Sequence, residues 1–361
     1  MSKVKLGEVA IEHKETCKGS KDGYPIVGLE HLIPEEVTLT TWNEGSDNTF
    51  TKMFRKGNVL FGRRRAYLKK AAVAPFDGIC SGDITVIEAI PDCILPELLP
   101  FIIQNDDLFD FAVGKSAGSL SPRVKWEHLK NYEFELPDMD KQRELAELLW
   151  AMDATKKTYQ KLIAATDELV KSQFIEQFGY IGKNSKGFPM VPVADVCEEL
   201  FAGGDKPADN APEKNDKYPY PVYSNGEGPN GLLCFSKAYR VSKEAITVSA
   251  RGAIGYSAIR EPFFTPVVRL LTVVPKANMN IVFLKYYIDA SNLTGTGSSQ
   301  GQLTLPEFKK LVVPVPPMDL QEQFAAFVRQ SDKSKFAVQN FSNLNLSGPQ
   351  PIRISPATPL P

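Results

Sequence analysis

The sequence has few of the residues that build metal centres and covalent crosslinks. It contains three histidines (His13, His31 and His128), none in an H-E-x-x-H or similar spacing, and five scattered cysteines with no C-x-x-C pair. An odd, unpaired set of cysteines favours a reducing compartment and argues against a zinc site. We therefore expect neither a metal nor an organic cofactor.

Long hydrophobic runs are absent as well. No apolar stretch approaches the roughly 18 residues that a membrane span needs, and the start, MSKVKLGEVAIEHKE, has no apolar core of a signal peptide. These features predict a soluble, cytoplasmic protein without membrane contact. Because the net charge is only −1, any binding to nucleic acid must come from local basic patches.

Motifs of nucleotide-dependent catalysis are missing too. VGKSAG (113–118) has Phe109 where a phosphate-binding loop needs its first glycine, and no G-x-G-x-x-G follows a strand-like segment. An adenine methyltransferase would be expected to show an acidic or amide residue before Pro-Pro-aromatic, but the one Pro-Pro lies in VPPMD at 315–319. The sequence therefore predicts a protein that is not itself an enzyme.

What the chain does have is an internal repeat, which decides the fold prediction. Residues 136–142 read LPDMDKQ and residues 315–321 read VPPMDLQ, and similar segments precede each copy in the same order. Chance similarity is the alternative, but the shared ending P-x-M-D-x-Q disfavours it. The paired segments are VKLGEVA (4–10) with VPVADVC (191–197), GYPIVGLEHL (23–32) with KYPYPVYSNGE (217–227), KGNVLFGRRRAYLKKAAV (56–73) with KEAITVSARGAIGYSAI (243–259), and residues 98–111 with 281–293.

Local patterns predict the elements of each copy. The pair 56–73 and 243–259 should form a strand, a Gly/Arg-rich turn and a second strand, because β-branched and apolar residues flank each turn. The pair 98–111 and 281–293 is long enough for a short helix.

A long helix is expected after the first copy, because no Pro or Gly occurs from Asp140 to Phe178. These 39 residues would span about 58 Å, or at most about 17 base pairs of duplex, with Asp138 or Asp140 as N-cap. Apolar positions spaced by three and four predict a seam that needs a partner helix, which the second copy offers. The seam and its counterpart include Leu145, Leu148, Met152, Tyr159, Leu162 and Leu169, with Phe324, Phe327 and Val328.

In its two P-x-M-D-x-Q junctions, the helix RELAELLWAMDATKKTYQKLIAATDELVKSQFIEQFG and the two Gly/Arg loops, the chain resembles the specificity subunit of type I restriction-modification systems. Gln142 and either Gln321 or Gln323 occupy the family's glutamine position. The resemblance covers roughly residues 4–340. It implies an α+β fold of two pseudo-repeated target-recognition domains separated by long antiparallel coiled-coil helices.

The same resemblance implies the function. Each domain would read one half of a split sequence in double-stranded DNA, and the helices would dock methylation subunits and possibly restriction subunits. The expected divisions are 1–137 (first domain), 138–179 (central helix), 180–316 (second domain), 317–346 (C-terminal helix) and 347–361 (Pro-rich disordered tail). The last helix is shorter than the family pattern, which suggests a truncation or rearrangement and questions symmetric docking of two methylation subunits.

Candidate DNA-binding residues in the first domain lie between Lys52 and Lys70, a segment with eight basic residues and no acid. Arginine can pair bidentately with guanine, and lysine suits phosphate. A solvated, charged strand edge is the alternative. The candidates are Lys52, Arg55, Arg63, Arg64, Arg65, Tyr67, Lys69 and Lys70.

In the second domain the candidates are Asn225, whose amide could pair with adenine, and Arg240, Ser249 and Arg251 around a glycine-rich turn. Ordinary hairpin punctuation explains the same pattern equally well. Polar loops before the two junctions add candidates for which a simple surface role is favoured: Lys115, Ser116, Ser299 and Gln300.

A different class of function also fits the long helices. The chain could be a non-catalytic scaffold or dimerisation protein that does not bind DNA. Salt-dependent affinity for duplex DNA separates the two, because a scaffold would show no steep salt dependence.

Overall fold

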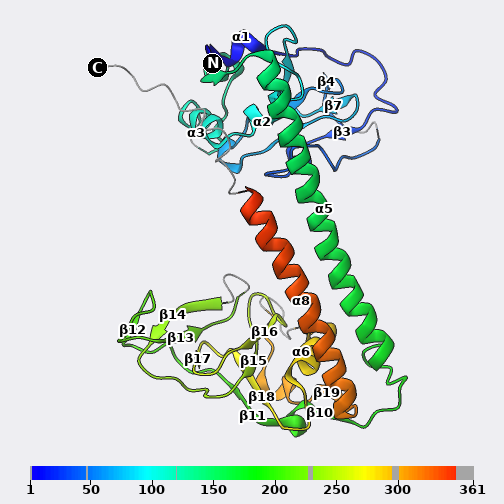
Figure 1. Ribbon diagram of the computed structural model, residues 1–361, viewed down its shortest axis with the longest axis vertical. Helices are drawn as coiled ribbons and strands as arrows, with labels where there is room; N and C mark the ends of the chain where they lie inside the picture. The colour runs from blue at the N-terminus through cyan, green and yellow to red at the C-terminus, as the bar shows by residue number, and fades with distance from the viewer. Residues whose placement is uncertain (1, 46–47, 119, 227–230, 295–300, 347–361) are drawn as a thin grey trace. The chain divides into compact units, whose positions relative to one another are not determined.

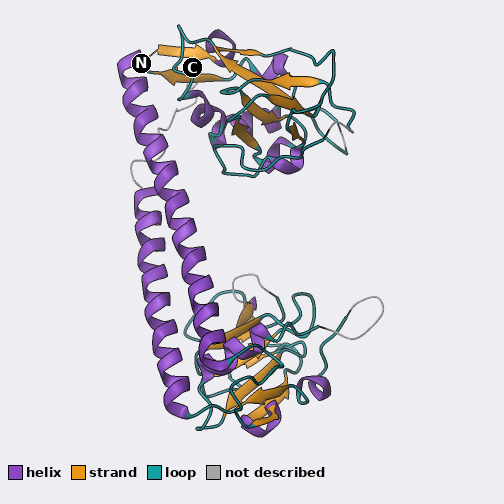
Figure 2. Ribbon diagram, turned by 90° about the vertical axis from the view of Figure 1, so that its right-hand side faces the viewer, coloured by secondary structure: helices purple, strands orange, loops and turns teal. Residues whose placement is uncertain are grey.

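A computed structural model describes residues 2–45, 48–118, 120–226, 231–294 and 301–346, with side chains up to residue 336 (Figure 1). The chain divides into two compact units, the first built mainly from residues up to Tyr159 and the second from Gln160–Asn340. Each unit combines strands with short helices (Figure 2), as the predicted mixed α and β composition requires.

The first unit contains a four-stranded antiparallel sheet in the order β2-β8-β5-β6 and a three-stranded sheet in the order β3-β7-β4, in which β3 and β7 are parallel. Strand β1 pairs antiparallel with β9. The strands are β1 (Ser2–Lys5), β2 (Ala10–Glu12), β3 (Ile26–Val27), β4 (Lys52–Phe54), β5 (Val59–Gly62), β6 (Ala71–Val73), β7 (Gly78–Cys80), β8 (Ile84–Ala89) and β9 (Glu133–Leu136). The helices are α1 (Leu6–Val9), η1 (Leu29–His31), η2 (Ala66–Leu68), α2 (Leu99–Ile103), α3 (Asp106–Gly114) and α4 (Trp126–Leu129).

The second unit repeats this plan with a sheet β11-β18-β15-β16, a sheet β12-β14-β13-β17 that holds a parallel pair β13–β17, and an antiparallel pair β10–β19. The strands are β10 (Met190–Pro192), β11 (Cys197–Ala202), β12 (Asn210–Ala211), β13 (Tyr220–Tyr223), β14 (Leu232–Ser236), β15 (Ala245–Val248), β16 (Ser257–Arg260), β17 (Thr265–Pro266), β18 (Leu271–Pro275) and β19 (Val312–Pro314). The helices are η3 (Val193–Val196), α6 (Ile281–Ala290) and α7 (Leu305–Phe308).

The predicted strand–turn–strand segments are confirmed in both units as β5–β6 and β15–β16. The predicted helix at 281–293 is α6, but the matching segment 98–111 is broken into α2 and α3. The break follows from local capping, because the Asn105 side chain accepts a hydrogen bond from the Asp107 N–H and begins a new helix.

Each unit has its own aromatic core. In the first, Phe61 stacks on Phe109 with ring centroids 5.5 Å apart. In the second, Phe178 lies 4.6 Å from Phe283 and 5.5 Å from Phe324. Burial of apolar side chains, these rings among them, provides most of the driving force for folding each unit.

The repeated P-x-M-D-x-Q has a specific structural role. The Gln142 amide donates to the Pro137 carbonyl (2.9 Å) and accepts from the Leu95 N–H (2.8 Å). Gln321 does the same with the Pro316 carbonyl (2.8 Å) and the Asn280 N–H (2.8 Å). Both glutamines are buried. The structure thus assigns the second junction glutamine to Gln321, because Gln323 is exposed.

The two long helices begin at these junctions: α5 spans Met139–Phe178 and α8 spans Met318–Leu346. Within the second unit they run antiparallel, since Phe174 contacts Phe324 at 5.4 Å while Lys335 pairs with Asp167 at 2.8 Å.

The apolar seam predicted along α5 is not the face that packs on the cores. Leu148, Leu162 and Leu169 are about half exposed, and the core contacts come instead from Ala146 in the first unit and from Val170, Phe174 and Phe178 in the second. Leu145 packs partly on the first core. The globular cores, rather than a three-and-four repeat, decide which face of α5 is buried.

The assignment of Phe324 and Val328 to subunit docking is corrected by their burial. Both side chains are almost fully enclosed in the second core, and Phe327 packs against the same core. Side chains enclosed in this way have no surface left for another chain.

The buried glutamine predicts a large stability difference between neighbouring positions. Gln321→Leu leaves the Asn280 N–H and the Pro316 carbonyl without partners, so we expect the unfolding free energy of the second unit to fall by about 2–4 kcal/mol. The exposed Gln323→Leu is the matched control and should change it by less than about 0.5 kcal/mol. Urea denaturation of both variants measures the difference, and equal midpoints would contradict the assignment.

The start of α5 gives a second, pH-dependent prediction. Asp138 accepts a hydrogen bond from the Lys141 N–H (3.0 Å), which lowers the pKa of its carboxyl group, whereas Asp140 is almost fully exposed. Asp138→Ala should therefore lower the melting temperature at pH 7, and Asp140→Ala should not. A lowered folded-state pKa stabilises above the unfolded value of about 3.9, so the difference between the variants should shrink as the pH falls below about 4. Thermal unfolding from pH 7 to pH 3 measures it, and a deficit for Asp138→Ala that stays constant with pH would contradict the capping role.

Candidate nucleic-acid interface

Three loops of the first unit meet beyond the end of β5. The turn Arg63–Arg65 receives a hydrogen bond from the Val124 N–H to the Arg63 carbonyl (3.0 Å) and donates from the Arg65 N–H to the Pro122 carbonyl (2.8 Å). The Arg63 N–H donates to the carbonyl of Asp83 (3.0 Å), which belongs to the loop between β7 and β8. Backbone hydrogen bonds thus join segments that are far apart in sequence into one surface.

Asp83 organises the charges of this surface. Its carboxylate accepts from Arg123 Nε (2.7 Å) and Nη2 (3.3 Å) and from Arg64 Nη1 (3.4 Å), while Arg64 Nε donates to the Ser121 hydroxyl. The hydrogen bond from the Arg123 guanidinium contributes most to lowering the pKa of Asp83, and the positive charge of Arg64 lowers it further. Each guanidinium has five N–H donors, so Arg64 and Arg123 keep donors that face away from Asp83.

Arg65 is the most available arginine of the turn. Its backbone is left-handed (φ 53°), its side chain is exposed, and no hydrogen bond or ion pair joins its guanidinium to the described residues. Tyr67 beside it is 55% exposed. Arg63 is half-buried, and its Nε finds no partner among the described residues. An exposed arginine next to an exposed aromatic ring suits contact with a base or a phosphate.

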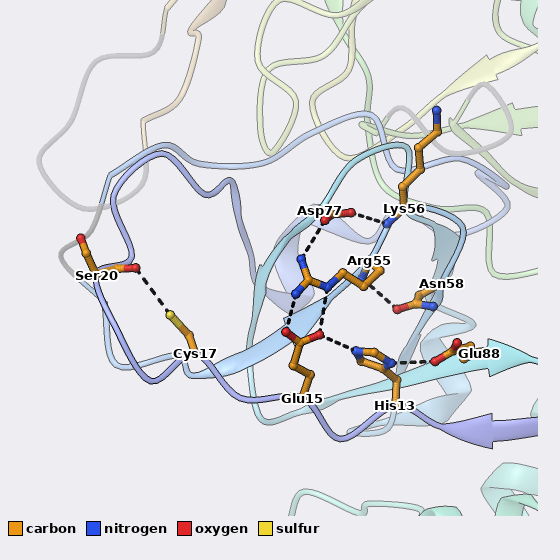
Figure 3. A network of polar contacts seen from close by, with 9 residues as sticks. All are labelled: His13, Glu15, Cys17, Ser20, Arg55, Lys56, Asn58, Asp77 and Glu88. Carbon is orange, nitrogen blue, oxygen red and sulfur yellow. Dashed lines mark hydrogen bonds and ion pairs between the residues drawn. The ribbon is translucent and has the colours of Figure 1, made fainter.

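Arg55 and Lys52 lie in the same basic segment but serve the fold. Figure 3 shows the Arg55 guanidinium between Glu15 and Asp77, bonding to Glu15 through Nε (2.9 Å) and Nη2 and to Asp77 through Nη1 (2.8 Å). Because of these bonds the pKa of Glu15 is lowered and that of Arg55 is raised. Lys52 Nζ donates to the Ile84 carbonyl (2.8 Å). Their charges are largely used inside the unit.

Of the remaining candidates of the first unit, the side chains of Lys69, Lys70 and Ser116 are engaged in hydrogen bonds, whereas that of Lys115 makes none to the described residues. Lys69 pairs with Asp106 (2.5 Å), which raises the pKa of the lysine, and Lys70 donates to the Leu29 carbonyl (2.7 Å). Lys115 lies 5.7 Å from the centre of the Phe111 ring and is exposed. The Ser116 hydroxyl donates to the Ala112 carbonyl (2.8 Å) at the end of α3. The structure therefore brings Arg63, Arg64 and Arg65 together in one turn. The side chains of Lys52, Arg55, Lys69 and Lys70 bond to other parts of the unit.

The second unit builds a matching surface. The Leu303 N–H donates to the Ala250 carbonyl (3.0 Å), as Val124 does to Arg63, so Arg251 occupies the position of Arg64. Arg251 Nη2 donates to Gln302 Oε1 (3.0 Å) and its side chain is exposed. By the same count Gln302 takes the place of Arg123. The repeat therefore places an arginine at one equivalent position in both units.

Asn225 and Ser249 prove to be part of the scaffold of this surface. The Asn225 amide donates to the Val268 carbonyl (2.6 Å) and accepts from the Ala250 N–H (2.7 Å), and the buried Ser249 hydroxyl accepts from the Gly226 N–H (3.2 Å). These bonds at both ends of the amide fix the Asn225 side chain within the unit.

Arg240 lies on a separate part of the second unit. It stacks over the Phe201 ring at 4.7 Å and lies 3.8 Å from a Glu199 carboxylate oxygen. The predicted residues Ser299 and Gln300 lie outside the described residues.

Four residues of this surface could not be recognised from the sequence by residue type alone: Asp83, Ser121, Arg123 and Gln302. Arg123 and Gln302 each lie in the segment before a P-x-M-D-x-Q junction, but neither residue stands out by type. Aligning the two copies at the first apolar residue before α4 and α7 (Val124 with Leu303) would have paired them and flagged both.

A hollow of about 530 Å³ also lies in the first unit, between β4 and the loop that carries Asp83. Its lining mixes Lys14 and Lys52 with Glu12, Glu15 and Asp83. With acids outnumbering bases, it does not form a phosphate pocket.

Comparison with known proteins finds relatives that share this repeated architecture. The family model described as type I restriction modification DNA specificity domain matches twice, at residues 1–165 and 185–345. A putative type I specificity subunit of Mycoplasma pneumoniae, S.MpnORF507P, is 31% identical over 212 residues, covering 57% of this chain and 56% of that protein. A second one from the same organism, S.MpnORF89P, is 38% identical over 136 residues, covering 38% of this chain and 41% of that protein.

The chain thus spans about half the length of these relatives. The crystal structure of a type I restriction-modification S subunit from M. genitalium has the same fold, with a TM-score of 0.60 at 13% identity, covering 95% of this chain and 92% of that one. No helix in the described part of the chain is long and apolar enough to cross a membrane. Specificity subunits of type I systems are themselves non-catalytic. Because the family model matches most of the chain, the chain belongs to the type I restriction-modification DNA specificity family.

Proposed function

We propose that this chain is the specificity subunit of a type I restriction-modification complex and that each unit binds one half of a bipartite target in double-stranded DNA. The observation that carries the proposal is the repeated loop surface. In both units a backbone bond from the loop before the junction (Val124 to Arg63, Leu303 to Ala250) holds the turn, and the next residue is an arginine, Arg64 or Arg251.

The chemistry of these arginines suits base recognition. Arg64 is oriented by Ser121 and Asp83, and Arg251 by Gln302, so less side-chain entropy is lost when the remaining N–H donors meet a base edge. Arg65 and Lys115, which are exposed, supply positive charge to phosphates.

The domain divisions 1–137 and 180–316, with α5 and α8 as antiparallel coiled-coil helices, belong to the same proposal. The antiparallel contacts of Phe174 with Phe324 and of Asp167 with Lys335 support it. The exposed leucines of α5, namely Leu148, Leu162 and Leu169, would form the surface that methylation subunits bind, since large exposed apolar side chains aligned on one helix usually mark an interface.

Recognition can be tested by purifying the chain with its methylation subunits and sequencing the methylome of cells that express the complex. We expect a split motif of two short parts with a fixed gap. Arg63→Ala/Arg64→Ala/Arg65→Ala should abolish preference in one part and leave the other unchanged, because the three side chains belong to one loop of the first unit.

The control for this variant is Lys3→Ala/Lys5→Ala, which removes exposed positive charge from β1 and should keep both half-sites. An unchanged first half-site in the triple variant would refute the assignment of the turn. Affinity for duplex DNA that does not fall with salt would refute DNA binding and favour a scaffold.

Docking of methylation subunits gives a separate prediction. Leu148→Asp/Leu162→Asp/Leu169→Asp places charges at exposed apolar positions, so the chain should fold normally but lose the methylation subunits in co-purification. Gln160→Asp, also exposed on α5, is the matched control and should retain them. Retention of the subunits by the triple variant would show that they bind elsewhere.

A further inference from the structure

The loop between β17 and β18 has an unusual backbone. Val268 (φ 54°) and Arg269 (φ 60°) are consecutive left-handed residues, and neither is glycine. A β-branched residue such as valine is rare in this region, because its side chain clashes with the backbone there. Strain of this kind persists only where surrounding contacts impose it, and it concentrates at functional sites.

The surrounding contacts are present. The Val268 N–H donates to the Gly204 carbonyl (2.7 Å) and the Arg269 N–H to the Gly203 carbonyl (3.0 Å). A side chain at Gly203 would place a Cβ 2.6 Å from the Pro266 backbone, so the glycine permits this close approach. The Asn225 amide fixes the Val268 carbonyl from the other side (2.6 Å).

Comparison of the two units shows what the left-handed loop changes. In the first unit the Ser81 N–H donates to the Val27 carbonyl, and the Ile84 N–H donates to the Ser81 carbonyl. In the second unit the Val267 N–H donates to the Tyr223 carbonyl, and the Leu270 N–H donates to the Val267 carbonyl. Ser81 and Val267 are therefore equivalent. Two residues after Ser81 comes Asp83, and two residues after Val267 comes Arg269. Arg269 therefore occupies the position of Asp83.

The two equivalent positions are held in opposite ways. In the first unit the antiparallel ladder continues directly, with the Arg63 N–H bonded to the Asp83 carbonyl, and the Asp83 side chain turns back to Arg64 and Arg123. In the second unit Asn225 inserts at this point and bridges the Ala250 N–H to the Val268 carbonyl.

As a consequence, the Arg269 side chain is left accessible at the surface of the second unit. Arg269 is exposed, and within the described part of the chain its guanidinium makes no hydrogen bond or ion pair. Its backbone is fixed by the Gly203 carbonyl and by the neighbouring Val268 bonds, so the side chain extends from a rigid base. Val268 next to it is 41% exposed. A rigidly based, unpaired arginine is well prepared for bidentate contact with guanine.

We propose that Arg269 determines sequence preference in the second half-site by contacting a base edge, and that Asn225 is a positioning residue that acts through the Val268 carbonyl. This inference rests on the proposed function and names the side chain through which its second unit would select DNA. It assigns to Asn225 a role in holding the loop rather than in touching DNA.

The test uses the complete complex with its methylation subunits and compares methylomes, together with binding to duplexes that vary only in the second half-site. Arg269→Ala should reduce discrimination at one position of that half-site by about 10-fold or more and leave the first half-site unchanged. Arg269→Lys keeps the charge but not the bidentate geometry and should lose discrimination as well. Lys243→Ala, at the opposite end of β15, is the charge-matched control and should keep both half-sites.

Asn225 is tested by rescue. Asn225→Ala should weaken the same position of the motif as Arg269→Ala does, because the loop is then free to leave its left-handed conformation. Adding Val268→Gly should restore preference in part, since glycine adopts positive φ without strain. A purely structural role for Asn225 would lower the stability of the unit without moving this one position of the motif.

The outcomes distinguish a failure of the proposed function from a failure of the inference about Arg269. If the wild-type complex methylates no split motif, the proposed function fails. If the wild type does so and Arg269→Ala keeps an unchanged motif, the inference about Arg269 fails while the proposed function stands. If Arg269→Ala weakens all second half-sites equally and Arg269→Lys restores them, Arg269 contacts phosphate, and its proposed role in sequence preference is wrong.

Discussion

Each unit of the protein depends on one buried side-chain amide. Gln142 and Gln321 bond to the carbonyl five residues before them and to a backbone N–H of a distant loop, Leu95 or Asn280. A proline-ended strand, a long helix and the loop that leads to the domain's own helices are tied at this point. Because a buried amide without partners is costly, the joint is tolerated only when all three parts are in place. The P-x-M-D-x-Q motif occurs twice because the same set of contacts between strand, helix and loop is made twice.

The second constraint is where the central antiparallel ladder of each unit ends. In the first unit it extends to the pair Arg63 and Asp83, and the acid beyond it ties the arginines of the neighbouring loops. In the second, the strand pairing stops at Val248 and Leu271, and an amide side chain takes over. The two ladders thus end differently although the two units share one fold. Two domains with one scaffold can in this way present arginines from different loops, which is what two different half-sites would require.

The sequence predicted what depends on local pattern. The order of segments, the strand–turn–strand units at β5–β6 and β15–β16 and the 40-residue helix α5 follow from periodicity and from the positions of Gly and Pro. It did not predict which face of α5 is buried, because Val170, Phe174 and Phe178 pack into a core whose other residues are spread along the chain from Val193 to Val328. Nor did it predict which basic residues are neutralised. The partners of Arg55 and Arg123 lie about 40 positions along the chain, and only the tertiary fold brings Glu15 and Asp83 to them.

The neutralised residues matter for how a protein with a net charge of only −1 would bind a polyanion. A segment with eight basic residues looks like a uniform electrostatic patch, yet Arg55 spends all three of its guanidinium nitrogens on Glu15 and Asp77, and Lys69 is paired with Asp106. What remains is a small number of arginines whose donors are oriented but not exhausted. Such a surface gains less non-specific affinity from counterion release than a basic patch would. Under the proposed function, its selectivity would rest on the geometry of individual guanidinium groups, which carboxylates and amides hold in place.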